Sequence, residues 1–264
     1  MKHWALILGS SSGFGAALSR AFAGAGYNIL GVHLDRSSTM SAVNDLIKEI
    51  ESKNVSVHFF NVNAADVEKR KSVLDKIEKE IFKNGEDNIK VMVHSLAFGT
   101  LKPYFGEKTE DDLTQKQLEM TIDVMGNSIV YWSQDIVRRG LMSRGGKIFG
   151  MTSSGGRRVI KGYGAVSAAK AVLESHCRQL AMELGTKMGI SVAPVLAGVT
   201  ETPAMKKIPN ADSIIADAIK RNPFDRLTNP EEIAEIIVSI TNQKNNWMNG
   251  NIIYADGGES IVEL

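Results

Sequence analysis

The chain has 264 residues, of which 43% are hydrophobic and 23% are charged, a composition that excludes a disordered or fibrous protein. Its 31 basic and 30 acidic residues leave a net charge of +1, too small for the electrostatic footprint that nucleic-acid binding needs. The only cysteine, Cys177, excludes an intrachain disulfide, and no apolar run approaches the roughly 20 residues of a membrane span, so we expect a cytoplasmic protein with neither a membrane nor a nucleic-acid partner.

Seven apolar runs of strand length recur along the chain, and each ends at turn residues. Helical patterns separate them, and the clearest covers residues 67–81, where the apolar residues share one face. Strands that alternate with helices indicate βαβ units, and runs that are apolar on both sides indicate a parallel sheet between two helical layers. The predicted strands are residues 5–8, 28–32, 55–60, 90–94, 147–151, 190–195 and 251–254.

This alternation predicts one doubly wound α/β domain over residues 1–264, because no linker, repeat or low-complexity tract interrupts it. The basic run at residues 69–71 is flanked by acidic residues and is interpreted as a solvated helix face. Cys177 lies inside a helical apolar pattern, which predicts a buried thiol and not a nucleophile.

The segment at residues 201–223 departs from the sheet pattern, because three prolines bracket a helical stretch rich in Met, Ile and Ala. A connection of this length is typical of a lid, and the alternative is a permanently packed surface helix. We expect Lys206 and Lys207 to remain outside, where an acidic partner can reach them. The residues expected to contact an aliphatic substrate are Ala204, Met205, Ile208, Ile214 and Ile215.

A glycine-rich turn follows the first predicted strand and opens a helix. Glycines let the backbone approach a pyrophosphate, whose charge is favoured by the helix N-terminus. A tight strand-to-helix turn is the alternative, but strand, turn, helix and second strand are all present, which predicts a Rossmann-like dinucleotide site. The residues assigned to the cofactor here are Gly9, Ser11, Ser12, Gly13, Phe14 and Gly15.

Asp35 and Arg36 follow the second predicted strand, where a carboxylate binds the ribose diol of NAD and an arginine pairs with the 2′-phosphate of NADP. Asp35 lies about two positions later than the usual acid, which suggests that it points away. We therefore expect NADPH in preference to NADH, the alternative being two solvated loop charges. Asn61 and Val62, after the third strand, are assigned to the adenine, although Asn61 also suits a strand-end cap.

Tyr163 and Lys170 lie seven residues apart at the start of a predicted helix, nearly two turns, so their side chains share one face. The residue one helical turn before Lys170, four positions away, is Val166, and its side chain has no proton to give. Hydride addition to the β-carbon of an enoyl thioester places the charged oxygen farther from the nicotinamide than carbonyl reduction does. A phenol one turn away supplies that reach, with Lys170 holding the ribose and lowering the pKa of the phenol; a surface Tyr and Lys are the alternative.

At these residues the chain resembles the enoyl-acyl-carrier-protein reductases of bacterial fatty-acid synthesis, a branch of the short-chain dehydrogenases with a Gly-x3-Gly-x-Gly turn. The resemblance also covers the segments 93–98 (VHSLAF), 197–202 (AGVTET) and 256–258 (DGG). It implies a homotetramer and an enoyl thioester carried on acyl carrier protein. It further implies cofactor contacts from Ser95, Leu96, Ala97, Ala197, Gly198, Thr200 and Thr202, besides Lys170.

Two positions, Ser153 and Val199, depart from the family's pattern. Ser153 stands where many enoyl reductases have a second Tyr, and a Ser there is what carbonyl-reducing enzymes use as a catalytic partner. Val199 replaces the family's Pro. Met125 agrees with the family, since it stands where ordinary dehydrogenases have a catalytic Asn that enoyl reductases do not keep either. The alternatives are therefore a carbonyl reductase for a 3-oxoacyl group or small ketone, with Ser153 catalytic, and a non-catalytic dinucleotide sensor. The five histidines show no ligand spacing, so we assign no metal.

Overall fold

The computed structural model describes residues 3–83 and 86–263, so residues 1, 2, 84, 85 and 264 of the expected domain lie outside it. A seven-stranded parallel sheet forms the centre, in the order β3-β2-β1-β4-β5-β6-β7. All seven predicted strands are confirmed, and the largest difference is that β5 begins five residues earlier than its apolar run. The strands are β1 (His3–Leu8), β2 (Asn28–His33), β3 (Val57–Asn61), β4 (Asn88–His94), β5 (Met142–Thr152), β6 (Ser191–Ala197) and β7 (Ile253–Ala255).

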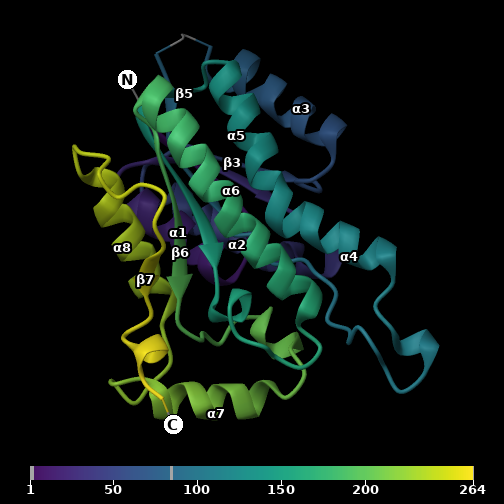
Figure 1. Ribbon diagram of the computed structural model, residues 1–264. Coiled ribbons are helices and arrows are strands. Elements are labelled where there is room, and N and C mark those ends of the chain that lie inside the picture. Colours follow the sequence, from purple (N-terminus) through teal and green to yellow (C-terminus); the bar gives the residue numbers. More distant parts are fainter. Residues whose placement is uncertain (1–2, 84–85, 264) are drawn as a thin grey trace.

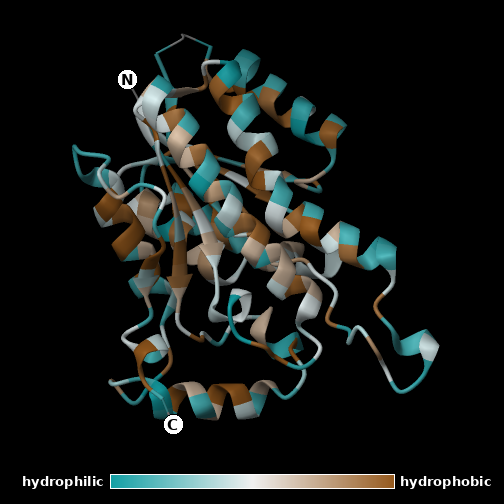
Figure 2. Cartoon of the chain, in the orientation of Figure 1, coloured by the Kyte–Doolittle hydropathy of each residue, from teal (hydrophilic) through white to brown (hydrophobic). Residues whose placement is uncertain are grey.

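Helices cover both faces of the sheet, as the doubly wound prediction requires (Figure 1). Side chains alternate along each strand, so Leu6 and Leu8 of β1 pack in one layer while Ala5 and Ile7 pack in the other. Figure 2 shows hydrophobic strands enclosed by helices whose outward sides are hydrophilic. One layer contains α1 (Gly13–Gly24), α2 (Met40–Glu51) and α8 (Pro230–Asn242), and the other contains α3 (Val67–Lys76), α5 (Ser128–Arg138) and α6 (Gly164–Met188).

The helix predicted over residues 67–81 is α3 followed by a π-helical turn at Ile77–Ile81. The prediction that the whole basic run is solvated is wrong for Arg70, which is only 8% exposed. Its Nε donates to Asp135 Oδ2 at 2.7 Å, and its guanidinium lies over the ring of Tyr131. The local pattern misses this contact because Asp135 lies 65 residues away in the sequence.

The carboxyl ends of the strands meet at one edge of the sheet, where the strand order reverses between β1 and β4. Ligands of doubly wound proteins bind in the crevice at such a reversal. The segment predicted as a lid lies across this edge and contains a short helix, Met205–Lys207, followed by α7 (Ala211–Arg221) (Figure 1). A separate loop projects beside it and leads into α4 (Gln115–Ile122) (Figure 1). None of the helices in the described ranges is long and apolar enough to cross a membrane.

A buried lysine anchors the segment that precedes β7. Lys147 of β5 is 2% exposed, and its Nζ donates to three oxygens, Gln243 O at 3.0 Å, Asn245 O at 2.9 Å and Asn246 Oδ1 at 2.6 Å. We expect Lys147→Met to lower the free energy of unfolding by about 2 kcal/mol, because buried acceptors that lose their donor are costly. Denaturant titration checks this beside Lys161→Met, which removes an exposed lysine. A loss no larger than that of the control would contradict the anchoring role.

Candidate active site

Three glycines let the turns at the sheet edge approach one another closely. Gly9 has a φ of +88°, and a Cβ there would lie 2.5 Å from the carbonyl oxygen of Ser95, which follows β4. A Cβ on Gly15 would overlap the carbonyl oxygen of Gly9, and one on Gly13 would lie 3.2 Å from Thr202 Cγ2. The first turn of α1 has no side-chain cap. This cradle, with free helical N–H groups at its base, fits the pyrophosphate of a dinucleotide.

Asp35 faces the glycine-rich turn, so the expectation that it points away is wrong. Its Oδ2 lies 2.9 Å from His33 Nδ1, and its Oδ1 accepts a hydrogen bond from the Thr39 hydroxyl at 2.9 Å. Burial raises the pKa of Asp35, but hydrogen bonds from Ser11, Thr39 and His33 outweigh it and hold that pKa below its ordinary value. The contact with buried His33, two residues earlier in the chain, holds Asp35 in this orientation. The position of Asp35 in the sequence does not predict that contact.

Asn61 anchors the same loop through both of its amide atoms. Its Oδ1 accepts from the backbone N–H of Asp35 at 2.9 Å, and its Nδ2 donates to the carbonyl of Asp35 at 2.9 Å. Val62 follows, and its N–H donates to the carbonyl of His33 at 2.7 Å. Asn61 therefore holds together the ends of β2 and β3, at the place where sequence reasoning expected an adenine contact.

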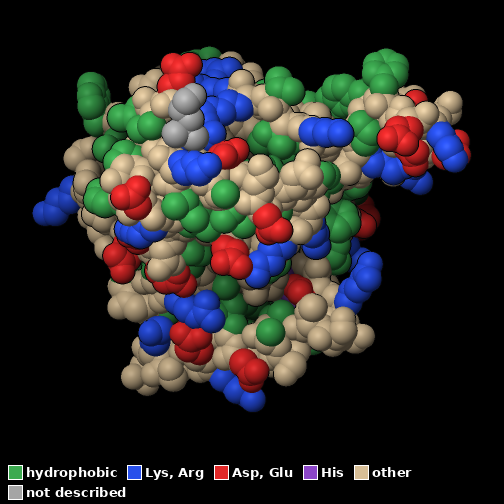
Figure 3. All heavy atoms as spheres, turned by 90° about the horizontal axis from the view of Figure 1, so that it is seen from below, with side chains coloured by type: hydrophobic (Ala, Val, Ile, Leu, Met, Phe, Trp, Pro, Cys, Tyr) green, Lys and Arg blue, Asp and Glu red, His purple; other side chains and the backbone are tan. Residues whose placement is uncertain are grey.

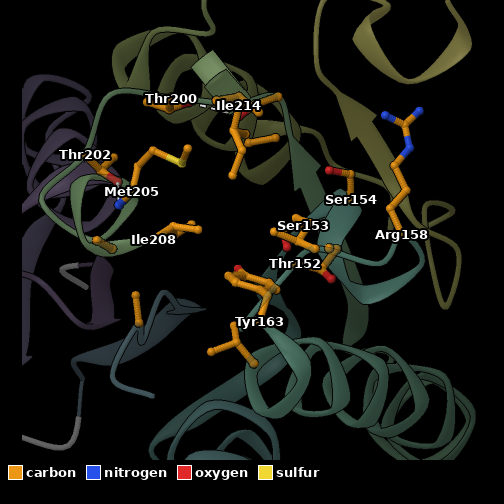
Figure 4. A pocket seen from close by; sticks show the side chains of 18 of the residues that line it. Thr152, Ser153, Ser154, Arg158, Tyr163, Thr200, Thr202, Met205, Ile208 and Ile214 are labelled. Atoms are coloured by element: carbon orange, nitrogen blue, oxygen red, sulfur yellow. Dashed lines mark hydrogen bonds between the residues drawn. The ribbon is translucent and has the colours of Figure 1, made fainter. Parts of the chain in front are cut away.

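A cavity of about 420 Å³ opens beside this cradle. In Figure 4, Tyr163 and Ser153 lie on one side and Met205, Ile208 and Ile214 of the lid segment lie across from them. Predicted cofactor residues from three separate turns line the same space, but Ser95 and Leu96 are not among the lining residues. The lining includes Phe14, Ala97, Gly99, Leu101, Met125, Ser153, Val159, Ile160, Tyr163, Val166, Ala197, Gly198, Thr200, Thr202, Ala204, Met205, Ile208 and Ile214.

Four of the five apolar residues that sequence reasoning assigned to the substrate in segment 201–223 line the cavity. Ile215 does not line the cavity. Lys207 lies at the edge of the cavity and is exposed, as predicted. Lys206 is exposed and forms an ion pair with Glu201 at 2.9 Å. Figure 3 shows this face of the molecule, on which acidic and basic side chains are mixed.

Tyr163 is the N-cap of α6 and lies immediately before the first helical residue, Gly164. Its ring lies against Gly155, where a Cβ would come within 2.5 Å of Tyr163 Cε1. Burial raises the pKa of the phenol, and the neighbouring Ser153 hydroxyl opposes this. The phenol is therefore protonated at neutral pH and able to donate. Ser153 Oγ is buried and has no hydrogen-bond partner among the described residues.

Lys170 is 6% exposed and does not line the cavity, and its Nζ donates to the carbonyl of Met151 at 2.7 Å. Burial lowers its pKa to about 8, although Glu174, one turn along α6, opposes this. Glu174 is also buried, and its Oε1 accepts from the Thr152 hydroxyl at 2.7 Å. Sequence reasoning missed Glu174, although its spacing of four residues from Lys170 is the usual signal for a helical ion pair.

Two further buried groups lie near Lys170. Burial, together with the charge of Lys170, lowers the pKa of His94 to about 3, so its imidazole is neutral. Burial raises the pKa of Cys177 to about 12, which makes this thiol unreactive at neutral pH and confirms the sequence prediction. Within the part of the chain that the structure describes, no group of three or more His, Cys, Asp or Glu side chains is placed to hold a metal ion.

The low pKa of Lys170 predicts a pH dependence of stability. Between about 8 and the ordinary 10.5, the unfolded chain holds the proton and the folded chain does not, so the contribution of Lys170 to stability rises with pH. The free energy of unfolding of the parent, relative to that of Lys170→Met, should therefore rise by on the order of 2 kcal/mol from about pH 7 to about pH 10. Denaturant unfolding of both cofactor-free proteins measures this, and a difference that does not change with pH would contradict it.

A family model described as enoyl-(acyl carrier protein) reductase matches residues 9–260. The chain belongs to this family. It is thus an oxidoreductase of the short-chain dehydrogenase superfamily, and the superfamily binds a nicotinamide dinucleotide. The sequence prediction of the family and of the Rossmann-like fold is confirmed.

Relatives with different activities resemble the chain to a similar degree. An NADH-dependent enoyl-acyl-carrier-protein reductase of Bacillus cereus, FabI, is 29% identical over 188 residues, 69% of this chain and 70% of that protein. A 3-oxoacyl-acyl-carrier-protein reductase of Thermotoga maritima, FabG, is 26% identical over 253 residues, 96% of each chain. The crystal structure of an NADH-dependent enoyl reductase from Aquifex aeolicus superposes with a TM-score of 0.84 at 20% identity, covering 99% of this chain and 98% of that one, which shows a shared fold.

Proposed function

We propose that this enzyme reduces the β-carbon of an enoyl thioester, with acyl carrier protein as the carrier and NADPH as the favoured cofactor. The main support is the placement of Tyr163, which lines a largely apolar cavity, while Val166, four residues before Lys170, presents only carbon to it. The position that holds a proton donor in an ordinary Tyr-x3-Lys dehydrogenase is therefore apolar, and the donor lies one turn farther away. The cytoplasmic location and the homotetramer stay predictions.

The chemistry requires one hydride and one proton. Bound NAD(P)H supplies the hydride. As the substrate's β-carbon accepts it, the electrons of the carbon–carbon double bond move toward the thioester oxygen, where Tyr163 donates a hydrogen bond to the developing enolate. Tyr163 then transfers its proton to the enolate oxygen, the enol rearranges to the saturated thioester, and water returns a proton to the phenolate. Ser153 Oγ, which has no partner among the described residues, is available as a second donor to the same oxygen.

Lys170 contributes charge. Its ammonium has three N–H donors, and the bond to Met151 leaves two for the cofactor ribose and for stabilising the phenolate form of Tyr163. Glycines 9, 13 and 15 hold the pyrophosphate, and the turn at 197–202 seats the nicotinamide. Met205, Ile208 and Ile214 exclude water from the acyl chain.

Carbonyl reduction is the second candidate, and the unpartnered Ser153 hydroxyl beside Tyr163 specifically favours it. Cofactor oxidation with crotonyl thioester and with acetoacetyl thioester, each with NADH and NADPH, separates the two reactions. Turnover of the crotonyl substrate supports the proposal, and turnover of acetoacetyl thioester alone would replace it with ketoreduction. Tight cofactor binding without turnover of either would indicate a dinucleotide sensor.

The preference for NADPH depends on Arg36, which is exposed and forms no ion pair with another described residue. Arg36→Ala is expected to weaken NADPH binding on the order of tenfold to a hundredfold and NADH binding little, because a charge-assisted phosphate contact contributes roughly 1.5 to 3 kcal/mol. Fluorescence titration of both cofactors measures this, with Lys53→Ala as an exposed basic control. Asp35, now seen to face the turn, favours the opposite outcome: small, equal losses for the two cofactors would assign the ribose site to Asp35.

A further inference from the structure

The C-terminal turn directs a buried carboxylate at the active site. Asp256 accepts hydrogen bonds from the backbone N–H groups of Gly258 at 3.0 Å and Ser260 at 2.9 Å, which closes a tight turn. Gly257 and Gly258 have φ values of 62° and 87°, a left-handed conformation that glycine adopts readily. As a result Glu259 enters the protein interior, where it is only 3% exposed.

The two oxygens of Glu259 contact different parts of the site. Its Oε2 accepts the backbone N–H of Val199 at 2.8 Å, in the turn that follows β6. Its Oε1 lies 3.5 Å from Nη2 of Arg221, the last residue of α7, and Arg221 lines the cavity. In the described chain no other carboxylate pairs with Arg221, whose Nε is buried without a hydrogen-bond partner.

Gly198 has no side chain where the carboxylate approaches. A Cβ there would lie 2.9 Å from Glu259 Oε2 and would overlap the hydroxyl of Thr228. The carbonyl of Val199 accepts the N–H of Thr228 at 3.1 Å, so the same turn is held on both sides. An ionised carboxylate is costly to bury unless it is paired, which makes the two contacts of Glu259 necessary for its position.

We propose that Glu259 is a positioning residue that couples the lid helix α7 to the turn at 197–202. The Glu259 carboxylate links a backbone amide of that turn to the guanidinium at the end of α7. Both segments are therefore held to the C-terminal turn that carries Glu259. The proposal rests on the proposed function only in assigning the turn to the nicotinamide and α7 to the acyl chain. The coupling itself is a property of the protein without substrate.

Glu259→Gln tests the coupling, because glutamine keeps the acceptor for Val199 but removes the charge that Arg221 faces. Hydrogen exchange of the cofactor-free protein should accelerate at least tenfold, by order of magnitude, across residues 211–221 and change little at 198–200. Glu259→Ala should accelerate exchange in both segments. Glu235→Gln, which removes an exposed carboxylate of α8, should change neither.

Arg221 variants distinguish coupling from general damage to the fold. Arg221→Met should accelerate exchange in α7 as Glu259→Gln does, Arg221→Lys should restore most of the protection, and combining Arg221→Met with Glu259→Gln should add nothing further. Far-ultraviolet circular dichroism confirms that each variant is folded. In folded Glu259→Gln and Glu259→Ala, exchange across 211–221 equal to that of the parent would overturn the proposal.

Kinetics give a second readout. Glu259→Gln should raise the KM for crotonyl thioester on the order of tenfold and lower kcat by less, because the lid binds the acyl chain while Tyr163 is untouched. A loss confined to kcat would overturn the role in the lid. If the parent reduces no thioester, the proposed function fails, yet the exchange experiment still decides whether Glu259 couples the two segments.

Discussion

Tyr163→Phe is expected to reduce turnover of crotonyl thioester on the order of a hundredfold or more while leaving cofactor affinity nearly unchanged. Removing a donor to a developing oxyanion in a water-poor site typically costs two or more orders of magnitude. The ring itself remains, so its packing against Gly155 is preserved. Lys170→Ala should instead impair both turnover and cofactor binding, because Lys170 is assigned to the ribose as well as to the phenol.

Stopped-flow measurement of cofactor oxidation, beside a binding titration, checks this prediction. Tyr104→Phe is the matched control, since Tyr104 lies against Gly164 at the start of the same helix but does not line the cavity. Full activity of Tyr163→Phe on every thioester tested would assign the enolate donor elsewhere. Ser153 would then be the first candidate, and Ser153→Ala the next variant.

Gly15→Ala is expected to lower the affinity for NADPH on the order of a hundredfold or more and also to destabilise the fold. The new Cβ would overlap the carbonyl oxygen of Gly9, a backbone atom that cannot rotate aside, so the turn and α1 must separate. The helical N–H groups then leave the position that favours the pyrophosphate.

Gly24→Ala provides the matched control at the other end of α1, because a Cβ there meets nothing within 4 Å. That variant should bind NADPH normally and gain about 0.5 to 1 kcal/mol of stability, since alanine loses less backbone entropy than glycine in a helix. Isothermal titration calorimetry and thermal unfolding of both variants make the comparison. Equal cofactor affinity in the two variants would refute the role of the glycine cradle.

The fold places residues from distant segments together through the carboxyl ends of the strands. The turns after β1, β4, β5 and β6 supply, in order, the glycine cradle, the segment beginning at Ser95, Ser153, and the turn at 197–202. Parallel strands require these ends to share one edge. The edge therefore accommodates both an anionic cofactor and an apolar substrate, each lined by different segments.

Features that depend on local regularity can be predicted from the sequence: seven strands, the helices between them, the glycine-rich turn, and a Tyr and a Lys two turns apart. These follow from side-chain periodicity and from steric limits that act over a few residues. The family resemblance depended on the same short segments.

The directions of the polar side chains, by contrast, depend on contacts between distant segments. Arg70 is buried because Asp135 and Tyr131 meet it from another helix, and Asp35 faces the cofactor turn because buried His33 holds it there. Glu259 reaches Val199 across 60 residues of sequence. A charged side chain is equally stable in water on any exposed face, so its own neighbours in the sequence do not predict its partner. Burial selects the one orientation in which that charge is paired.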